Sequence, residues 1–198
     1  MYVESNFVLE QTLQQEQCEA CDEILRLAVS GAISLVIPAF SLAEPHQALA
    51  LKAKARNRLR NEVENQISEL GRSRQYSGVH EESRAFVSAL AKSADQEQDG
   101  LEHAIEGLIR AAEIVPLDAG ILTDGSEAQA AFGMSGQDAI VLAPVLRHLQ
   151  QVAPGESCFL SRNSRDFDEP GVKERLDQFG CRYFANFDHA LQYILARV

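Results

Sequence analysis

The chain has 198 residues, a formal net charge of −11 and 45% apolar residues. This length suits one domain with room for an insertion, and the apolar share is enough to form a sizeable core. We find neither an apolar run that could cross a bilayer nor a signal peptide, so we expect a cytoplasmic protein without a membrane partner. The acidic balance argues against sequence-blind coating of DNA, which needs widely distributed positive charge, but it permits a local basic patch.

The four cysteines do not indicate a zinc site. Cys18 and Cys21 have CxxC spacing, but no second Cys pair or His pair stands near them, and both fall in a helical pattern. A structural zinc ion usually needs four protein ligands. Cys158 and Cys181 lie in apolar, strand-like runs, so we expect them to be core residues.

Short apolar runs alternate with helical patterns along the chain. The first strand begins at 2–3, is interrupted by polar residues at 4–6, and its apolar run resumes over 7–9. In the first part of the chain we then predict a helix over 9–28, a strand at 34–37, a long helix over 41–71 and helices over 81–92 and 101–112. The next predicted elements are a strand at 114–115, a helix over 118–131 and a helix that Ser135 caps and that reaches about Leu149. The last are a strand over 157–161, a helix over 172–178, a strand over 181–184 and a helix over 187–196.

This alternation predicts an α/β fold. Strands separated by helices form a parallel sheet with helices on both faces, and right-handed crossovers bring the strand ends to one edge. We therefore predict a three-layer α/β/α architecture with a central parallel sheet of about five strands. Residues 1–198 would form a single domain with an extended, mostly helical insertion around 65–112.

Polar side chains mark the carboxyl ends of the predicted strands. Glu4 ends the first strand, and Glu44 begins the helix after the second. Asp138 begins the helix before the fourth strand, while Asn163 and Asp166 follow that strand. Ligands of open parallel sheets bind at this edge, so we expect these side chains to face one crevice.

Carboxylates gathered this closely repel one another unless a cation offsets the repulsion. Oxygen ligands with open positions suit Mg²⁺ or Mn²⁺. Such a site can polarise a phosphodiester, activate water and stabilise the leaving oxygen. The residues therefore favour metal-dependent phosphodiester hydrolysis.

Each of these residues also has a structural interpretation. Glu44 could be half of a capping box, and Asp138 could be a first-turn acid favoured by the helix dipole. Asn163 and Asp166 could shape a turn. Glu4 is the hardest to explain in this way, because a charge beside a buried strand is costly without a partner.

Four segments, taken in order, resemble the acidic motifs of the PIN domain family. They are Tyr-Val-Glu-Ser-Asn-Phe-Val-Leu at 2–9, Leu-Val-Ile-Pro-Ala-Phe-Ser-Leu-Ala-Glu at 35–44, Ser-Gly-Gln-Asp-Ala-Ile-Val-Leu-Ala at 135–143 and Phe-Leu-Ser-Arg-Asn-Ser-Arg-Asp-Phe at 159–167. The order of motifs matches from residue 1 to about residue 168.

This resemblance implies a PIN-type endoribonuclease that uses Mg²⁺ or Mn²⁺. Many bacterial relatives are toxins of toxin–antitoxin pairs, so it also implies an RNA substrate and an antitoxin-like protein partner, and it is compatible with a homodimer. Carried over by motif position, the catalytic residues would be Glu4, Glu44, Asp138 and Asp166. The metal ligands would be Glu4, Glu44, Asp138 and Asn163. Asn6 and Ser161 would be supporting residues.

Two departures from the family pattern keep a second hypothesis open. Glu4 stands where the family usually has Asp, so its carboxylate reaches one methylene further. Asn163 would ligate only through a neutral carbonyl, although Asp166 could supply the charge. The alternative is therefore a catalytically weak or inactive PIN-like module that binds RNA or protein. A third hypothesis is a different metal-dependent phosphoryl-transfer enzyme that acts on small phosphate esters.

A basic stretch lies in the long second helix. Lys52, Arg56 and Arg60 follow i, i+4 spacing and share one face, which suits contact with a nucleic-acid backbone. The alternative is a solvated face paired with glutamates further along the same helix.

Overall fold

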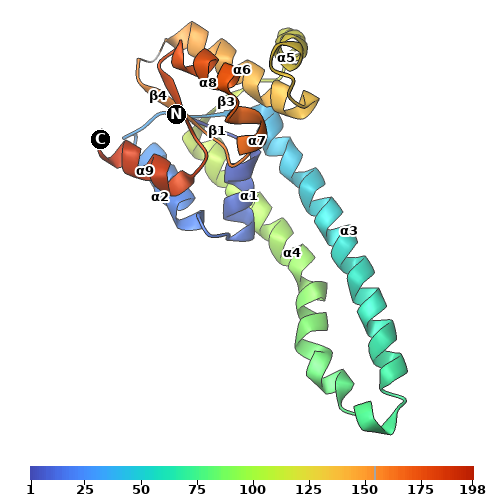
Figure 1. Cartoon of the computed structure of the whole chain (residues 1–198). Helices are drawn as coiled ribbons and strands as arrows, with labels where there is room; N and C mark the ends of the chain where they lie inside the picture. The colour runs from blue at the N-terminus through green and yellow to red at the C-terminus, as the bar shows by residue number, and fades with distance from the viewer. Residues whose placement is uncertain (154) are drawn as a thin grey trace. The chain divides into compact units, whose positions relative to one another are not determined.

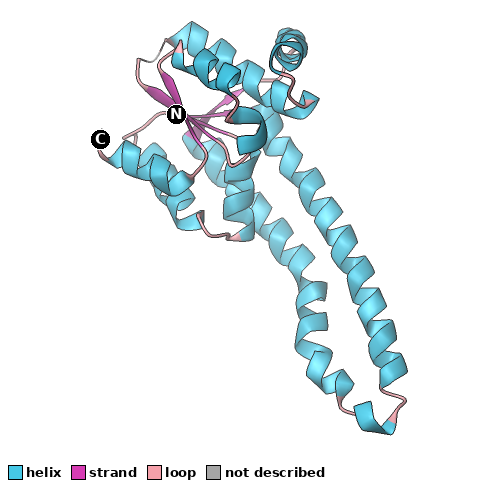
Figure 2. Cartoon of the chain, in the orientation of Figure 1, coloured by secondary structure: helices cyan, strands magenta, loops and turns pink. Residues whose placement is uncertain are grey.

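The computed structural model describes residues 1–153 and 155–198, which contain a five-stranded sheet. The strand order is β3-β2-β1-β4-β5 and every neighbouring pair is parallel, which confirms the predicted class. All five carboxyl ends therefore lie along one edge. Figure 2 shows the strands in magenta among the helices. The strands are β1 Tyr2–Val3, β2 Leu35–Pro38, β3 Ala112–Val115, β4 Ser157–Leu160 and β5 Cys181–Phe184.

The chain divides into two compact units, residues 1–45 with 101–198, and residues 46–100. The predicted insertion around 65–112 overlaps the second unit. The helices are α1 Ser5–Leu13, α2 Cys18–Val29, α3 Ala39–Leu70, the 3₁₀ turn η1 Arg74–Tyr76, α4 Val79–Ala111, α5 Ala119–Phe132, α6 Gly136–Val152, α7 Ser164–Phe167, α8 Pro170–Asp177 and α9 Phe187–Leu195.

The first unit has three layers (Figure 1). Helices α6 and α8 pack on one face of the sheet, with α5 against α6, while α9 packs on the other face beside α2. Tyr2, Val36 and Phe159 are adjacent in the register of β1, β2 and β4. They form one buried cluster with residues of α6, including Leu142 and Val145. The sheet is thus buried on both sides, as short apolar parallel strands require.

The second unit contains the long part of α3 and most of α4, joined by the turn at 71–78. The two helices run antiparallel, and Arg56 of α3 forms an ion pair with Glu97 of α4 at 2.5 Å. None of the described helices combines the length and apolarity needed to cross a membrane.

Two predicted helical boundaries are wrong. The single helix over 9–28 is two helices, because Gln14 adopts a left-handed conformation (φ 48°) and ends α1. The helices over 81–92 and 101–112 are one continuous α4. The intervening 93–100 segment is polar, but half of its residues (one Ala, one Glu and two Gln) favour helix, and one interior Gly costs only about 1 kcal/mol.

The start of α3 also differs from the prediction. The helix begins at Ala39, so Ser41 lies inside it, and the Ser41 hydroxyl is buried with no hydrogen-bond partner within the described part of the chain. Pro45 consequently lies inside the helix, beyond the first turn where a missing N–H would be harmless.

We expect Phe159→Ala to lower the free energy of unfolding by about 3–5 kcal/mol, because it removes a fully buried ring from the central sheet. The ring packs edge-on against Phe167 with centroids 5.0 Å apart, so the loss extends to the segment after β4. Urea denaturation followed by circular dichroism measures the change. Leu122→Ala, at a side chain 48% exposed, is the control and should stay within about 0.5 kcal/mol of the unaltered chain.

Candidate active site

Glu4 is the first residue after β1 and the N-cap of α1. Its Oε2 accepts hydrogen bonds from the Asn6 backbone N–H at 2.9 Å and the Ser5 hydroxyl at 2.8 Å. The residue is 2% exposed, yet its Oε1 has no hydrogen-bond partner among the described residues. The helix N-terminus favours the negative charge, but half of the carboxylate remains unsatisfied.

Ser5 connects Glu4 to Glu44. The same hydroxyl oxygen lies 2.6 Å from Glu44 Oε2, which comes from the second turn of α3. A serine hydroxyl has one proton and donates to one carboxylate at a time. The other contact therefore requires a proton on a carboxyl group or a cation between the acids. Glu44 thus turns to Ser5, and the Ser41–Glu44 capping box is not formed.

Burial raises the pKa of Glu4 above its ordinary value, because the charged form loses its hydration. The Asn6 backbone amide and the Ser5 hydroxyl oppose this rise, with weaker contributions from the side chains of Ser161 and Asn6. Burial therefore favours the protonated form of Glu4 when no cation is present.

A second acidic group forms where α6 begins and β4 ends. The Asn163 side-chain amide donates to Asp138 Oδ1 at 2.8 Å and to Asp166 Oδ2 at 3.2 Å. Ser135 caps α6 and donates to Asp138 Oδ2 at 2.5 Å. Asn163 thus contacts both acids as a hydrogen-bond donor, and its amide would have to turn over to offer its carbonyl to a metal ion.

Burial is also the largest cause of the raised pKa of Asp138. The negative charge of Asp166 raises it further, whereas hydrogen bonds from Ser135 and Asn163 lower it.

Ser161 lies between the two acidic groups. It is fully buried, its hydroxyl accepts the Asn163 backbone N–H at 3.0 Å, and it also favours the ionised form of Glu4. Its carbonyl accepts a hydrogen bond from the Tyr183 hydroxyl at 2.8 Å. The supporting position predicted for Ser161 therefore has a physical basis in contacts to both groups.

Two contributors were not predicted, Ser5 and Tyr183. Ser5 lies between two predicted site residues, so its position on the first turn of α1 was the available signal. Tyr183 lies on β5 beside Phe159, and no motif in the sequence indicates it.

The donor set suits a hard cation, but the spacing of the acids is incomplete for one. The predicted ligands offer only oxygen atoms, and the unpartnered Oε1 of Glu4 is a free position of the required kind. Among residues 1–153 and 155–198, however, no three His, Cys, Asp or Glu side chains are arranged to hold a metal ion. Glu4 and Glu44 meet through Ser5, whereas Asp138 and Asp166 meet through Asn163.

Glu10 gives a contrast on the same helix. Its side chain is 1% exposed, as deeply buried as that of Glu4. Its Oε1 accepts the Gln17 backbone N–H at 2.6 Å, and its Oε2 accepts Arg162 Nη1 at 2.5 Å. Both oxygens of Glu10 are satisfied, so its burial is explained by structure alone, which is not true of Glu4.

The predicted basic face lies in the second unit. Arg56 pairs with Glu97, and Arg60 lies 3.9 Å from Glu64 on the same helix. Lys52 is exposed. Arg60 therefore has an acidic neighbour on its own helix, as the structural alternative anticipates, whereas the partner of Arg56 lies on α4.

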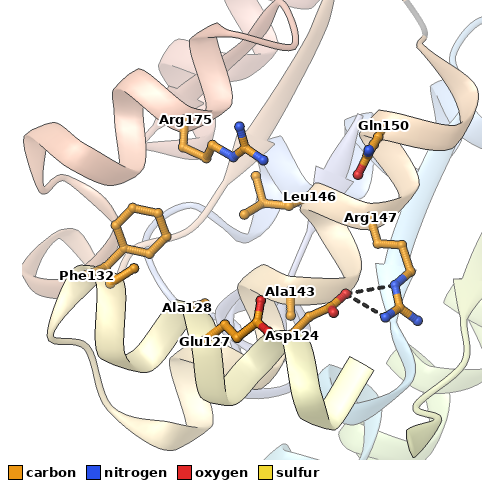
Figure 3. A pocket seen from close by; sticks show the side chains of 10 residues that line it. Asp124, Glu127, Ala128, Phe132, Ala143, Leu146, Arg147, Gln150 and Arg175 are labelled. Carbon is orange, nitrogen blue, oxygen red and sulfur yellow. Dashed lines mark hydrogen bonds and ion pairs between the residues drawn. The ribbon is translucent and has the colours of Figure 1, made fainter. Parts of the chain in front are cut away.

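A cavity of about 330 Å³ is lined by residues of α5, α6 and α8 (Figure 3). None of the predicted site residues lines it. Its Arg147 forms an ion pair with Asp124 and so joins α6 to α5. A second cavity, of about 500 Å³, is lined by Ser135, Gly136 and Gln137 and adjoins the Asp138 group.

The parallel sheet with acids at its carboxyl edge defines an α/β protein. A family model described as PIN domain matches residues 1–167. The chain belongs to the PIN domain family, whose members are generally nucleases. In a search of curated proteins, no match was found.

We expect Glu4→Gln to stabilise the metal-free protein at neutral pH. The raised pKa of Glu4 means that the unfolded chain releases this proton at a lower pH than the folded chain. Stability therefore falls as pH rises above the ordinary value of 4.5 and stays lower above the folded pKa. Melting temperatures between pH 4.5 and 8 should show the variant's advantage growing with pH.

Glu10→Gln is the matched control for this pH effect. It makes the same chemical change at an equally buried position of α1 but breaks the ion pair to Arg162, so it should destabilise the protein at neutral pH. If both variants lose stability, Glu4 is an ordinary satisfied N-cap.

Proposed function

We propose that the chain is a Mg²⁺- or Mn²⁺-dependent ribonuclease that hydrolyses phosphodiester bonds at the carboxyl edge of its sheet. The observation that carries this proposal is Glu4, a buried carboxylate with one unpartnered oxygen that shares a single serine proton with Glu44. A fold does not retain such an arrangement for stability, because an unsatisfied buried acid costs free energy. A divalent cation would satisfy it.

In this proposal Glu4, Glu44 and Asp138 hold the ion, and Asn163 joins them if its carbonyl faces inward. The bound ion would polarise the phosphodiester and lower the pKa of an attacking water. The Asn6 backbone amide orients Glu4, and Ser161 fixes the turn that carries Asn163. Asp166, which shares the Asn163 side-chain amide with Asp138, is the further catalytic carboxylate of the proposal.

RNA is the proposed substrate class, as for the family generally. The cavity beside Ser135 adjoins the Asp138 group and offers uncharged side chains, which suit a nucleotide next to the scissile bond. Lys52, Arg56 and Arg60 are the proposed contacts to the RNA backbone. An antitoxin-like protein partner and a homodimer remain part of the proposal through the family alone.

One observation favours a second candidate, a PIN-like module that binds RNA or protein without cutting. Asn163 already occupies the space between Asp138 and Asp166 as a hydrogen-bond donor and relieves part of the repulsion that would otherwise draw in a cation. Metal-dependent cleavage separates the two candidates.

We expect the purified chain to cleave an RNA oligonucleotide with Mn²⁺ or Mg²⁺, and chelation to stop cleavage. Asp138→Asn should lower kcat by at least about 100-fold, because it removes a charge and a proton acceptor at the site. Lys173→Ala, which breaks an exposed ion pair to Asp168 at 2.8 Å, is the control and should cleave normally. RNA binding without cleavage at every metal concentration would support the binding module instead.

We expect Lys52→Glu to weaken RNA binding and to reduce the slope of log affinity against log salt by about one, since one phosphate contact is lost. Lys52 is the cleanest probe of the basic face, because reversal of Arg56 would also break its ion pair with Glu97. Lys92→Glu makes the same change on α4 and serves as the control. Equal slopes for Lys52→Glu and the unaltered chain would remove the basic face from the proposal.

A further inference from the structure

We propose that Glu10 and Arg162 form a positioning pair that fixes the two acidic groups of the site relative to each other. This inference rests on the proposed function. Neither residue is among the acids and supporting side chains predicted for the site.

Arg162 is the residue between Ser161 and Asn163. Its Nη1 donates to Glu10 Oε2 at 2.5 Å and lies 3.5 Å from Glu16. Because its two chain neighbours both act in the site, anchoring the Arg162 side chain restricts the backbone from which Ser161 and Asn163 project. Asn163 in turn spaces Asp138 from Asp166.

Glu10 lies on the helix that Glu4 caps. Helix α1 therefore carries the first acidic group at its N-terminus and, six residues further on, the acceptor that anchors the turn of the second group. A helix of this length moves as one body, so the ion pair ties Asn163 to the same element as Glu4. No other ion pair between described residues joins α1 to the turn after β4.

The Glu10 carboxylate is itself held in place. Its second oxygen accepts the Gln17 backbone N–H at 2.6 Å. The Gln17 side-chain carbonyl accepts the Phe187 backbone N–H at 2.6 Å. These hydrogen bonds connect Glu10 to the start of α2 and, through Gln17, to the start of α9. The Glu10 carboxylate therefore has little freedom to follow a displaced Arg162.

The pair is strong enough to control the turn because one partner is buried. Removal of Arg162 leaves a carboxylate that is 1% exposed without its countercharge, which is far costlier than the loss of a surface ion pair. The turn is the part that relaxes, since Glu10 is held from its other side. A shift of about 1 Å in a group that positions reacting atoms can cost roughly 100-fold in rate.

The test compares cleavage of an RNA oligonucleotide in the presence of Mn²⁺ by four variants of the full chain. We expect Arg162→Ala to lower kcat roughly 10- to 100-fold with KM changed less than about threefold. Arg162→Lys keeps the charge and should recover part of this loss. Glu10→Gln combined with Arg162→Ala should be no slower than Arg162→Ala alone, because both changes remove one interaction. Lys173→Ala should cleave like the unaltered chain.

The hydrogen-exchange rate of the backbone amides at 161–167, measured without metal, reports how firmly the Glu10–Arg162 pair holds this turn, and it does not depend on catalysis. Faster exchange there in Arg162→Ala, but not in Lys173→Ala, supports the inference. It does so even if the unaltered chain does not cleave RNA, although that result overturns the proposed function. Unchanged exchange overturns the inference. If the chain cleaves RNA and Arg162→Ala retains full kcat, the inference fails while the proposed function stands. Should Arg162→Ala fold poorly, Arg162→Lys and Glu10→Gln provide the same comparison.

Discussion

The structure depends on one costly interaction, the burial of a carboxylate at the end of its central strand. β1 lies between β2 and β4, so the first residue after it faces segments that follow both neighbours. Glu4 occupies that position, where it meets Ser5 and, through it, Glu44. Ser161, the residue after β4, favours the ionised form of Glu4. The central place of β1 makes this the point at which the acids of the chain can converge.

Glu4, the N-cap of α1, and Glu10, inside it, show how burial alone differs from the arrangement proposed for the site. Glu10 has a backbone donor, a guanidinium partner and no free oxygen. Glu4 has donors for one oxygen only and competes with Glu44 for one hydroxyl proton. A search for buried acids would find both. The two are distinguished by their hydrogen-bond partners, because both oxygens of Glu10 are satisfied and one oxygen of Glu4, the acid proposed to hold a cation, is not.

The predictions succeeded where local signals were strong and failed at helix boundaries that the pattern of polar and apolar residues does not mark. β5 was predicted over 181–184 and lies there, and Ser135 caps α6 as expected. The helix over 9–28 failed because the chain turns at Gln14, where an amphipathic pattern continues unbroken. The loop over 93–100 failed because polar composition does not exclude helix when the residues are good helix formers.

The sequence by itself determined the parallel α/β class, the order of the acidic motifs and the oxygen-only chemistry of the candidate site. These follow from alternating periodicity and from which side chains fall at strand ends. The tertiary structure decided that Ser5 joins two glutamates, that Asn163 stands between two aspartates and that Arg162 neutralises Glu10. The reason is physical, since hydrogen bonds and ion pairs act over about 3 Å, and only packing sets such distances between residues 39 or 152 positions apart.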